Sequence, residues 1–117
     1  MKPAPLVIEN LSPAGAPQRI LRLQGPLVLA TSSHFQKVFQ QESPPTTYLD
    51  LSSVPYLDSA GLGCLVNAHI SSYKAGRKLA LVAPSDYVMR VIQQAHAHRL
   101  FDLFPSLDEA RRGLAAD

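Results

Sequence analysis

The sequence has little of several features that define other classes of protein. Cys64 is the only cysteine, so no intramolecular disulfide can form, and a reducing compartment suits the chain. The amino terminus lacks the apolar stretch of a signal peptide, and apolar runs such as residues 79–83 are far shorter than the roughly 18 residues of a membrane helix. Lys and Arg are scattered, and the longest basic cluster is the pair Arg111 and Arg112, which does not suggest nucleic-acid binding. We therefore expect a cytoplasmic protein with neither a nucleic-acid nor a membrane partner.

The composition that remains is that of one folded domain. The chain has 117 residues, of which 46% are hydrophobic and 17% charged, and its net charge is only +2. That is enough apolar material for one sizeable core and too little charge for intrinsic disorder. We expect residues 1–117 to form a single domain.

Hydrophobic patterns predict an α/β order of elements. Strands are expected at residues 6–11, 19–24, 47–51 and 79–83, with a short apolar connector or edge strand at 100–104. The first two strands should form a hairpin with Leu21 and Leu23 facing the core. Helices should follow Thr31, Ser32 or Ser33 as a cap, then Asp58, Ser85 and Ser106. This order predicts a mixed central sheet of four or five strands, with about four helices mainly on one face.

The second of these helices should carry an apolar stripe and end at a glycine. We expect its inward positions to be Leu62, Leu65, Val66, Ile70 and Tyr73. Gly76 is the expected left-handed stop.

The most informative segment spans residues 50–63. Asp58 is a good helix cap, because its carboxylate can accept hydrogen bonds from the free amides of the first turn. Ser59 then falls in that first turn, where a phosphate would be tolerated because helix amino termini favour anions. Gly61 and Gly63 are poor helix formers, and two of them in one turn indicate a close approach to the backbone.

This run, Asp-Leu-Ser-Ser-Val-Pro-Tyr-Leu-Asp-Ser-Ala-Gly-Leu-Gly, resembles the signature of the STAS domain, named for sulfate transporters and anti-sigma factor antagonists. The likeness covers nearly the whole chain. It implies that a partner anti-sigma factor with serine kinase activity phosphorylates Ser59, and that a serine phosphatase resets the cycle. The unphosphorylated form would bind the anti-sigma factor and so free a sigma factor. The partner-binding residues implied are Val28, Tyr56, Asp58, Ser59, Ala60, Gly61 and Gly63.

One departure from the family pattern leaves an alternative open. The loop after the second strand commonly reads Gly-x-Leu-Asp in antagonists, whereas this chain has Gly25-Pro26-Leu27-Val28. Val28 therefore replaces an acid near the phosphorylation site. The alternative is a constitutive scaffold subunit of a larger assembly, such as a stress-signalling particle or a lipid-transport machine. STAS domains also form the tails of anion transporters, which the lack of a membrane segment disfavours.

Residues that could support catalysis are not arranged for it in the sequence. Cys64 and His69 are five residues apart on one helix, about 140° off the same face. Ser59 and His69 would be about 15 Å apart along it. We expect Cys64 to be a small packed residue, and we expect no enzyme activity, no metal and no cofactor.

Overall fold

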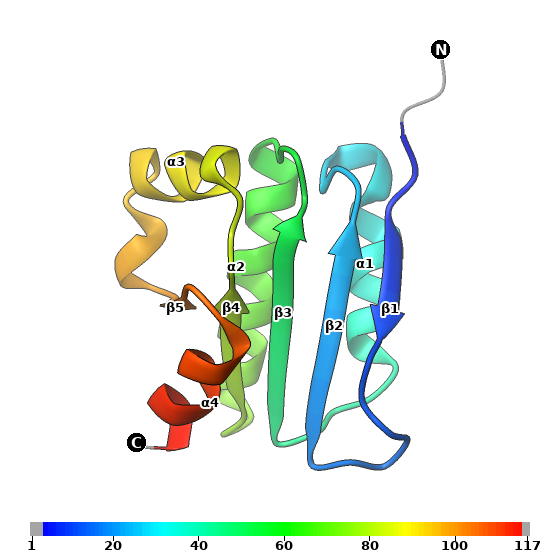
Figure 1. Cartoon of the computed structure of the whole chain (residues 1–117). Helices are drawn as coiled ribbons and strands as arrows, with labels where there is room; N and C mark the ends of the chain where they lie inside the picture. The colour runs from blue at the N-terminus through cyan, green and yellow to red at the C-terminus, as the bar shows by residue number, and fades with distance from the viewer. Residues whose placement is uncertain (1–3, 116–117) are drawn as a thin grey trace.

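Five strands follow one another across a single sheet in the order of the sequence (Figure 1). The computed structural model describes residues 4–115. The first pair is antiparallel and all later pairs are parallel. The strands are β1 (Val7–Asn10), β2 (Gln18–Gln24), β3 (Thr46–Ser53), β4 (Lys78–Val82) and β5 (Asp102–Phe104). The predicted hairpin, the mixed sheet and the edge strand within residues 100–104 are confirmed.

Three helices connect the parallel strands and lie on one face of the sheet. They are α1 (Leu29–Gln40), α2 (Ser59–Lys74) and α3 (Asp86–Gln94), and a 3-10 turn, Ala97–Arg99, follows α3. Because each connection is a crossover between adjacent strands, and such crossovers are right-handed, all three helices fall on the same side. After β5, α4 (Leu107–Ala115) packs on the opposite face, in front of the sheet in Figure 1. The expectation of helices mainly on one face is confirmed.

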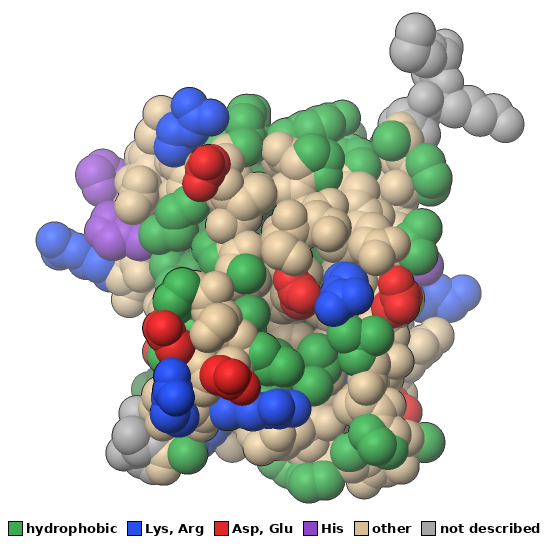
Figure 2. Space-filling view, in the orientation of Figure 1, with side chains coloured by type: hydrophobic (Ala, Val, Ile, Leu, Met, Phe, Trp, Pro, Cys, Tyr) green, Lys and Arg blue, Asp and Glu red, His purple; other side chains and the backbone are tan. Residues whose placement is uncertain are grey.

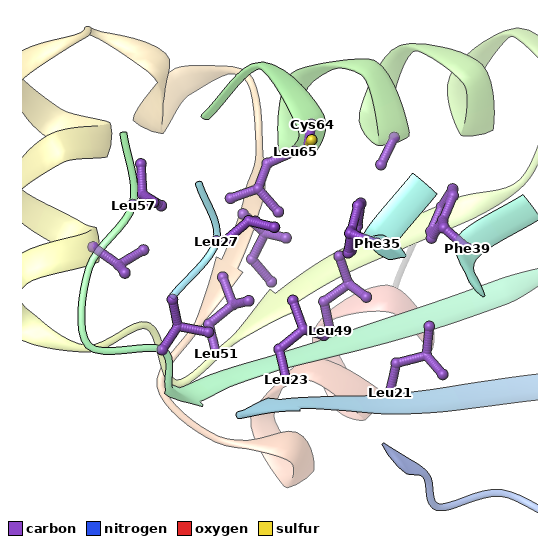
Figure 3. Close-up of a cluster of buried hydrophobic side chains, with 14 of the residues drawn as sticks. Leu21, Leu23, Leu27, Phe35, Phe39, Leu49, Leu51, Leu57, Cys64 and Leu65 are labelled. Atoms are coloured by element: carbon purple, nitrogen blue, oxygen red, sulfur yellow. The ribbon is translucent and has the colours of Figure 1, made fainter. Parts of the chain in front are cut away.

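Alternating strand positions divide the buried side chains between the two faces. Leu21 and Leu23 of β2 and Leu49 and Leu51 of β3 are directed at the three-helix layer, where they meet Leu65 of α2 (Figure 3). The smaller cluster on the other face contains Tyr48, Ala80, Val82, Ala110 and Leu114, so α4 covers β3 and β4 there. The predicted inward face of residues 19–24 is correct.

The predicted cap of α1 was wrong. The helix begins at Leu29, and Thr31 is already inside it, with its Oγ1 atom accepting a hydrogen bond from the Val28 amide at 3.0 Å. Ser32 and Ser33 lie within the helix as well. The sequence suggested a serine or threonine cap because it does not show that the acceptor for the amides at the start of α1 comes from a different loop.

The predicted apolar stripe of α2 was only partly right. Leu65 is fully buried, and Leu62 and Val66 pack partly buried against the core, but Ile70 is 39% exposed and Tyr73 is 78% exposed. The buried positions are instead mostly small residues: Gly61, Cys64, Leu65, Ala68 and Ser72. Small side chains face inward because α2 packs closely on the sheet and on α1. The polarity of the residues alone therefore extended the predicted buried face of α2 wrongly to Ile70 and Tyr73.

The remaining helix ends follow the sequence. The Ser85 hydroxyl accepts a hydrogen bond from the Val88 amide, and the Ser106 hydroxyl accepts one from the Glu109 amide. Gly76, with a φ of +71°, follows the carboxyl end of α2 as expected.

Candidate functional site

The site begins with Asp58, which precedes α2 at the carboxyl end of β3. One carboxylate oxygen, Oδ1, accepts a hydrogen bond from the Gly61 amide at 2.8 Å, which confirms the predicted cap. The Gly61 amide, with further help from the Leu29 and Ala60 amides, holds the pKa of the Asp58 carboxyl below its usual value. Asp58 is therefore ionised and fixed in orientation at neutral pH.

The second oxygen of Asp58 reaches a different helix. Oδ2 accepts a hydrogen bond from the Leu29 amide at 3.1 Å, at the start of α1. Val28, the residue before that helix, has no side-chain acceptor, so Asp58 takes over the capping of α1. One carboxylate thus joins the amino ends of two helices, and this contact brings Val28 beside the Asp58–Ser59 pair.

Backbone contacts lock the same two loops together. The Leu27 amide donates to the Tyr56 carbonyl at 3.2 Å, and Leu27 forms an isolated parallel bridge with Leu57. A Cβ atom on Gly61 would overlap the Leu27 carbonyl oxygen, so only glycine allows the loop to lie this close to α2. The close approach predicted from the glycines is therefore found at Gly61, and it comes from the chain itself.

Ser59 is exposed on this framework as the first residue of α2. Within residues 4–115 its hydroxyl makes no hydrogen bond, so the group is free to react or to be covered. Exposed apolar side chains occur nearby: Leu29 is 73% exposed, and Tyr56 and Tyr87 are each 44% exposed. The two tyrosine rings meet edge to face at 6.3 Å. Figure 2 shows apolar side chains at this upper end of the molecule, over the starts of α1 and α2.

The predicted partner-binding residues do not all have the same exposure. Tyr56, Asp58 and Ser59 are exposed, while Val28, Ala60 and Gly63 are half-buried. Gly61 is buried, and the structure gives it a packing role within the domain in place of a surface position. The role of these residues in partner binding stays a prediction.

Leu29 and Tyr87 were missed by sequence reasoning. Leu29 directly follows the Gly25–Val28 loop, whose proximity to the site could have indicated that Leu29 is also part of it. Tyr87 belongs to α3, and only the fold places it against Tyr56.

The candidates for catalysis lie apart from this site. Cys64 is 3% exposed, and burial raises the pKa of its thiol. His69 is half-buried and its ring meets Phe101 edge to face at 5.9 Å. Cys64 is the packed residue that its position predicted.

Among residues 4–115, no three His, Cys, Asp or Glu side chains are grouped as metal ligands. No helix in that part of the chain is both long and apolar enough to cross a membrane.

Gly61→Ala should lower the free energy of unfolding by about 1–3 kcal/mol, because the new methyl group forces the Leu27 loop away from α2. Gly63→Ala is the matched control. A Cβ atom at Gly63 meets nothing within 4 Å, so the better helix former should add up to about 1 kcal/mol. Urea unfolding of both variants measures the difference, and equal stabilities would show that the loop contact has no energetic role.

Asp58→Ala should lower the free energy of unfolding by about 0.5–2 kcal/mol at neutral pH, the usual range for loss of a helix cap. The pKa of Asp58 is lowered in the folded state, so its contribution exists above the unfolded value near 3.9 and is lost as the pH falls through the folded value. The gap between parent and variant should therefore narrow below about pH 4. Asp58→Asn, which keeps an acceptor, should lose less stability and all of this pH dependence. Denaturant unfolding across the pH range checks both, and a constant gap would contradict the assignment.

Comparison with known proteins finds a matching family and several similar proteins. The model of the STAS domain family matches residues 8–110. A curated relative from Thermotoga maritima, named "Putative anti-sigma factor antagonist", is 35% identical over 63 residues, which are 54% of this chain and 56% of the relative. The chain thus matches only about half of that relative's length.

Solved structures share the fold over most of the chain. The crystal structure of a protein of the same description from Thermotoga maritima has a TM-score of 0.78 at 25% identity, with 92% of both chains covered. The murine Solute Carrier 26 family member A9 anion transporter has a TM-score of 0.74 at 25% identity, covering 87% of this chain and 18% of the transporter.

Proposed function

The chain belongs to the STAS domain family, and we propose that it is a protein-binding switch of the anti-sigma factor antagonist type, controlled by phosphorylation of Ser59. The unphosphorylated form binds an anti-sigma factor that has serine kinase activity, and a sigma factor is thereby freed. Phosphorylation of Ser59 by that partner dissociates the complex, and a serine phosphatase restores the unphosphorylated form that binds. The cycle takes place in a bacterial cytoplasm.

The observation that carries this proposal is the position of Ser59. Its hydroxyl is exposed at the first residue of α2, beside a carboxylate that two backbone amides hold in place. A hydroxyl at such a site can reach the γ-phosphate of a bound kinase without any opening of the fold. The rigid loops on both sides favour recognition of one serine over others.

The fold should tolerate the phosphate. A phosphoserine carries about −1.5 to −2 charges, and the amino end of α2 offers a favourable dipole of about 0.3–1 kcal/mol. Repulsion from Asp58 offsets part of this gain. The effect of modification therefore falls on the interface and leaves the domain folded.

The surroundings explain how the phosphate ends binding. Leu29, Tyr56 and Tyr87 give the neighbourhood of Ser59 an apolar character. A partner that covers these side chains must also remove water from Ser59. Removing water from a serine hydroxyl costs little compared with removing it from a doubly charged group. Val28, where antagonists commonly have an acid, extends this apolar character and favours a partner surface without a basic group at that point.

The decisive experiment isolates the partner by pull-down from the source bacterium, then incubates the pair with ATP and magnesium. Mass spectrometry should find one phosphate, on Ser59. Ser59→Ala should remain folded, take up no phosphate and bind constitutively. Ser53→Ala, which removes an exposed hydroxyl at the end of β3, should be phosphorylated like the parent. Absence of phosphate on Ser59 in the parent complex would refute the switch and favour the constitutive scaffold.

A further inference from the structure

A polar pocket lies at the opposite end of the sheet from Ser59, where β2 and β3 begin (the lower end in Figure 1). Its volume is about 150 Å³, room for several water molecules at about 30 Å³ each. Its lining includes Arg19, Phe39, Glu42, Thr47, Ser72 and Arg77.

Arg19 is a buried arginine whose donors are only partly used. Its side chain is 4% exposed and stacks over the Phe39 ring at 4.9 Å. Nη1 donates to the Phe39 carbonyl at 3.0 Å and to the Glu42 carbonyl at 3.2 Å, while Nε donates to the Thr47 hydroxyl. Nη2 makes no hydrogen bond within residues 4–115 and keeps contact with solvent. Because Arg19 lines the pocket, these two N–H groups are available to a molecule bound there.

Arg77 brings a second guanidinium to the same pocket. It is half-buried, and within residues 4–115 the one ion pair joins Arg22 to Asp50, so Arg77 has no acidic partner there. Burial lowers the pKa of Arg19, Glu42 raises it in part, and the charge of Arg77 lowers it again. The two like charges are thus close enough to repel each other.

The carboxyl ends of α1 and α2 also face this region, and several of their carbonyls already accept hydrogen bonds. Arg19 Nη1 donates to the Phe39 carbonyl of α1, and the amides of Ala75, Gly76 and Arg77 donate to the carbonyls of Ser71, Ser72 and Tyr73 in α2. Their remaining dipole effect is weaker than a charge-assisted hydrogen bond. Lys78 also lines the pocket, but its ammonium is already engaged, since it donates to the Leu114 carbonyl at 2.8 Å.

We propose that this pocket binds a compact oxyanion, namely phosphate, as the free ion or as the terminal group of a phosphate monoester. The N–H groups of Arg19 Nη2 and of the Arg77 guanidinium supply paired donors whose planar geometry matches phosphate oxygens. The Ser72 hydroxyl, on a residue 3% exposed that lines the pocket, adds a neutral donor. The site is independent of Ser59 and of the proposed switch.

The test is a titration of the isotopically labelled chain with inorganic phosphate, followed by NMR at constant ionic strength set with sodium chloride. The amides of Ser72 and Arg77 should shift in a saturable way. Arg77→Gln should weaken binding at least about tenfold. Arg111→Gln makes the same charge change on the exposed surface of α4 and should bind like the parent. Glu42→Gln removes the one acid of the pocket and should tighten binding several-fold.

A second titration with glycerol 3-phosphate distinguishes the two sources. Tighter binding than inorganic phosphate assigns the pocket to a monoester, and weaker binding assigns it to the free ion. Shifts that do not saturate, equal affinity of Arg77→Gln and the parent, or a change in the same direction for Glu42→Gln and Arg77→Gln would overturn the proposal.

Discussion

Ser59→Glu should weaken binding of the partner by about a hundredfold, or about 2.8 kcal/mol at 1.4 kcal/mol per factor of ten. A glutamate carries one charge where phosphoserine carries about −1.5 to −2, so it should reproduce part of the switch. Moving a complex from 99:1 to 1:99 requires about 5.5 kcal/mol between forms. The phosphate itself should approach that value, because its charge lies among Leu29, Tyr56 and Tyr87 in the proposed contact. Calorimetry with the purified partner measures both.

Ser59→Gln is the matched control for this result, because it has nearly the size of glutamate and no charge. It should bind several-fold more weakly than the parent and clearly more tightly than Ser59→Glu. Equal losses for both variants would mean that size alone blocks the interface. If Ser59→Glu binds as tightly as the parent, the switch is wrong and the constitutive scaffold takes its place.

Leu65→Ala should lower the free energy of unfolding by about 2–5 kcal/mol, the range for a leucine removed from a core that relaxes only partly. Leu65 has no exposed surface and lies in the core cluster between α2 and the sheet, among the residues of Figure 3. Such a loss is a large fraction of the whole free energy of unfolding of a small domain, which is typically about 5–15 kcal/mol. Urea unfolding at neutral pH gives the value directly.

Ile70→Ala provides the comparison on the same helix. Ile70 is 39% exposed, so its truncation should cost less than about 0.5 kcal/mol. The sequence had assigned both residues to one inward stripe. A large loss at Ile70 together with a small one at Leu65 would mean that α2 is rotated from the orientation described above.

Patterns confined to a few neighbouring residues were sufficient for most of the fold. The alternation of Leu21 and Leu23 fixed the inward face of β2, since side chains alternate across a strand. Asp58 and Ser85 marked two helix starts because a cap acts within its own first turn. The order of strands and helices implied parallel crossovers, and their handedness placed α1, α2 and α3 on one face.

The same local reasoning failed where the answer depended on another part of the chain. Thr31, Ser32 and Ser33 were reasonable caps for α1, yet the acceptor at its start is Asp58 from the loop before α2. Tyr73 is apolar enough for the core but lies beyond the edge of the contact between α2 and the sheet. Neither fact can be read from residues near in sequence.

The sequence by itself therefore determined the α/β class, the element order, and the Asp58–Ser59 pair at the start of α2. Only the tertiary structure decided that one carboxylate caps two helices, that Gly61 must leave room for the Leu27 carbonyl, and that Tyr87 stands against Tyr56. It also decided that Arg19 and Arg77 share a pocket. The physical reason is the range of the interactions. Periodicity, caps and turns act over three or four residues, whereas these contacts form only once the sheet has brought distant loops to the same end of the molecule.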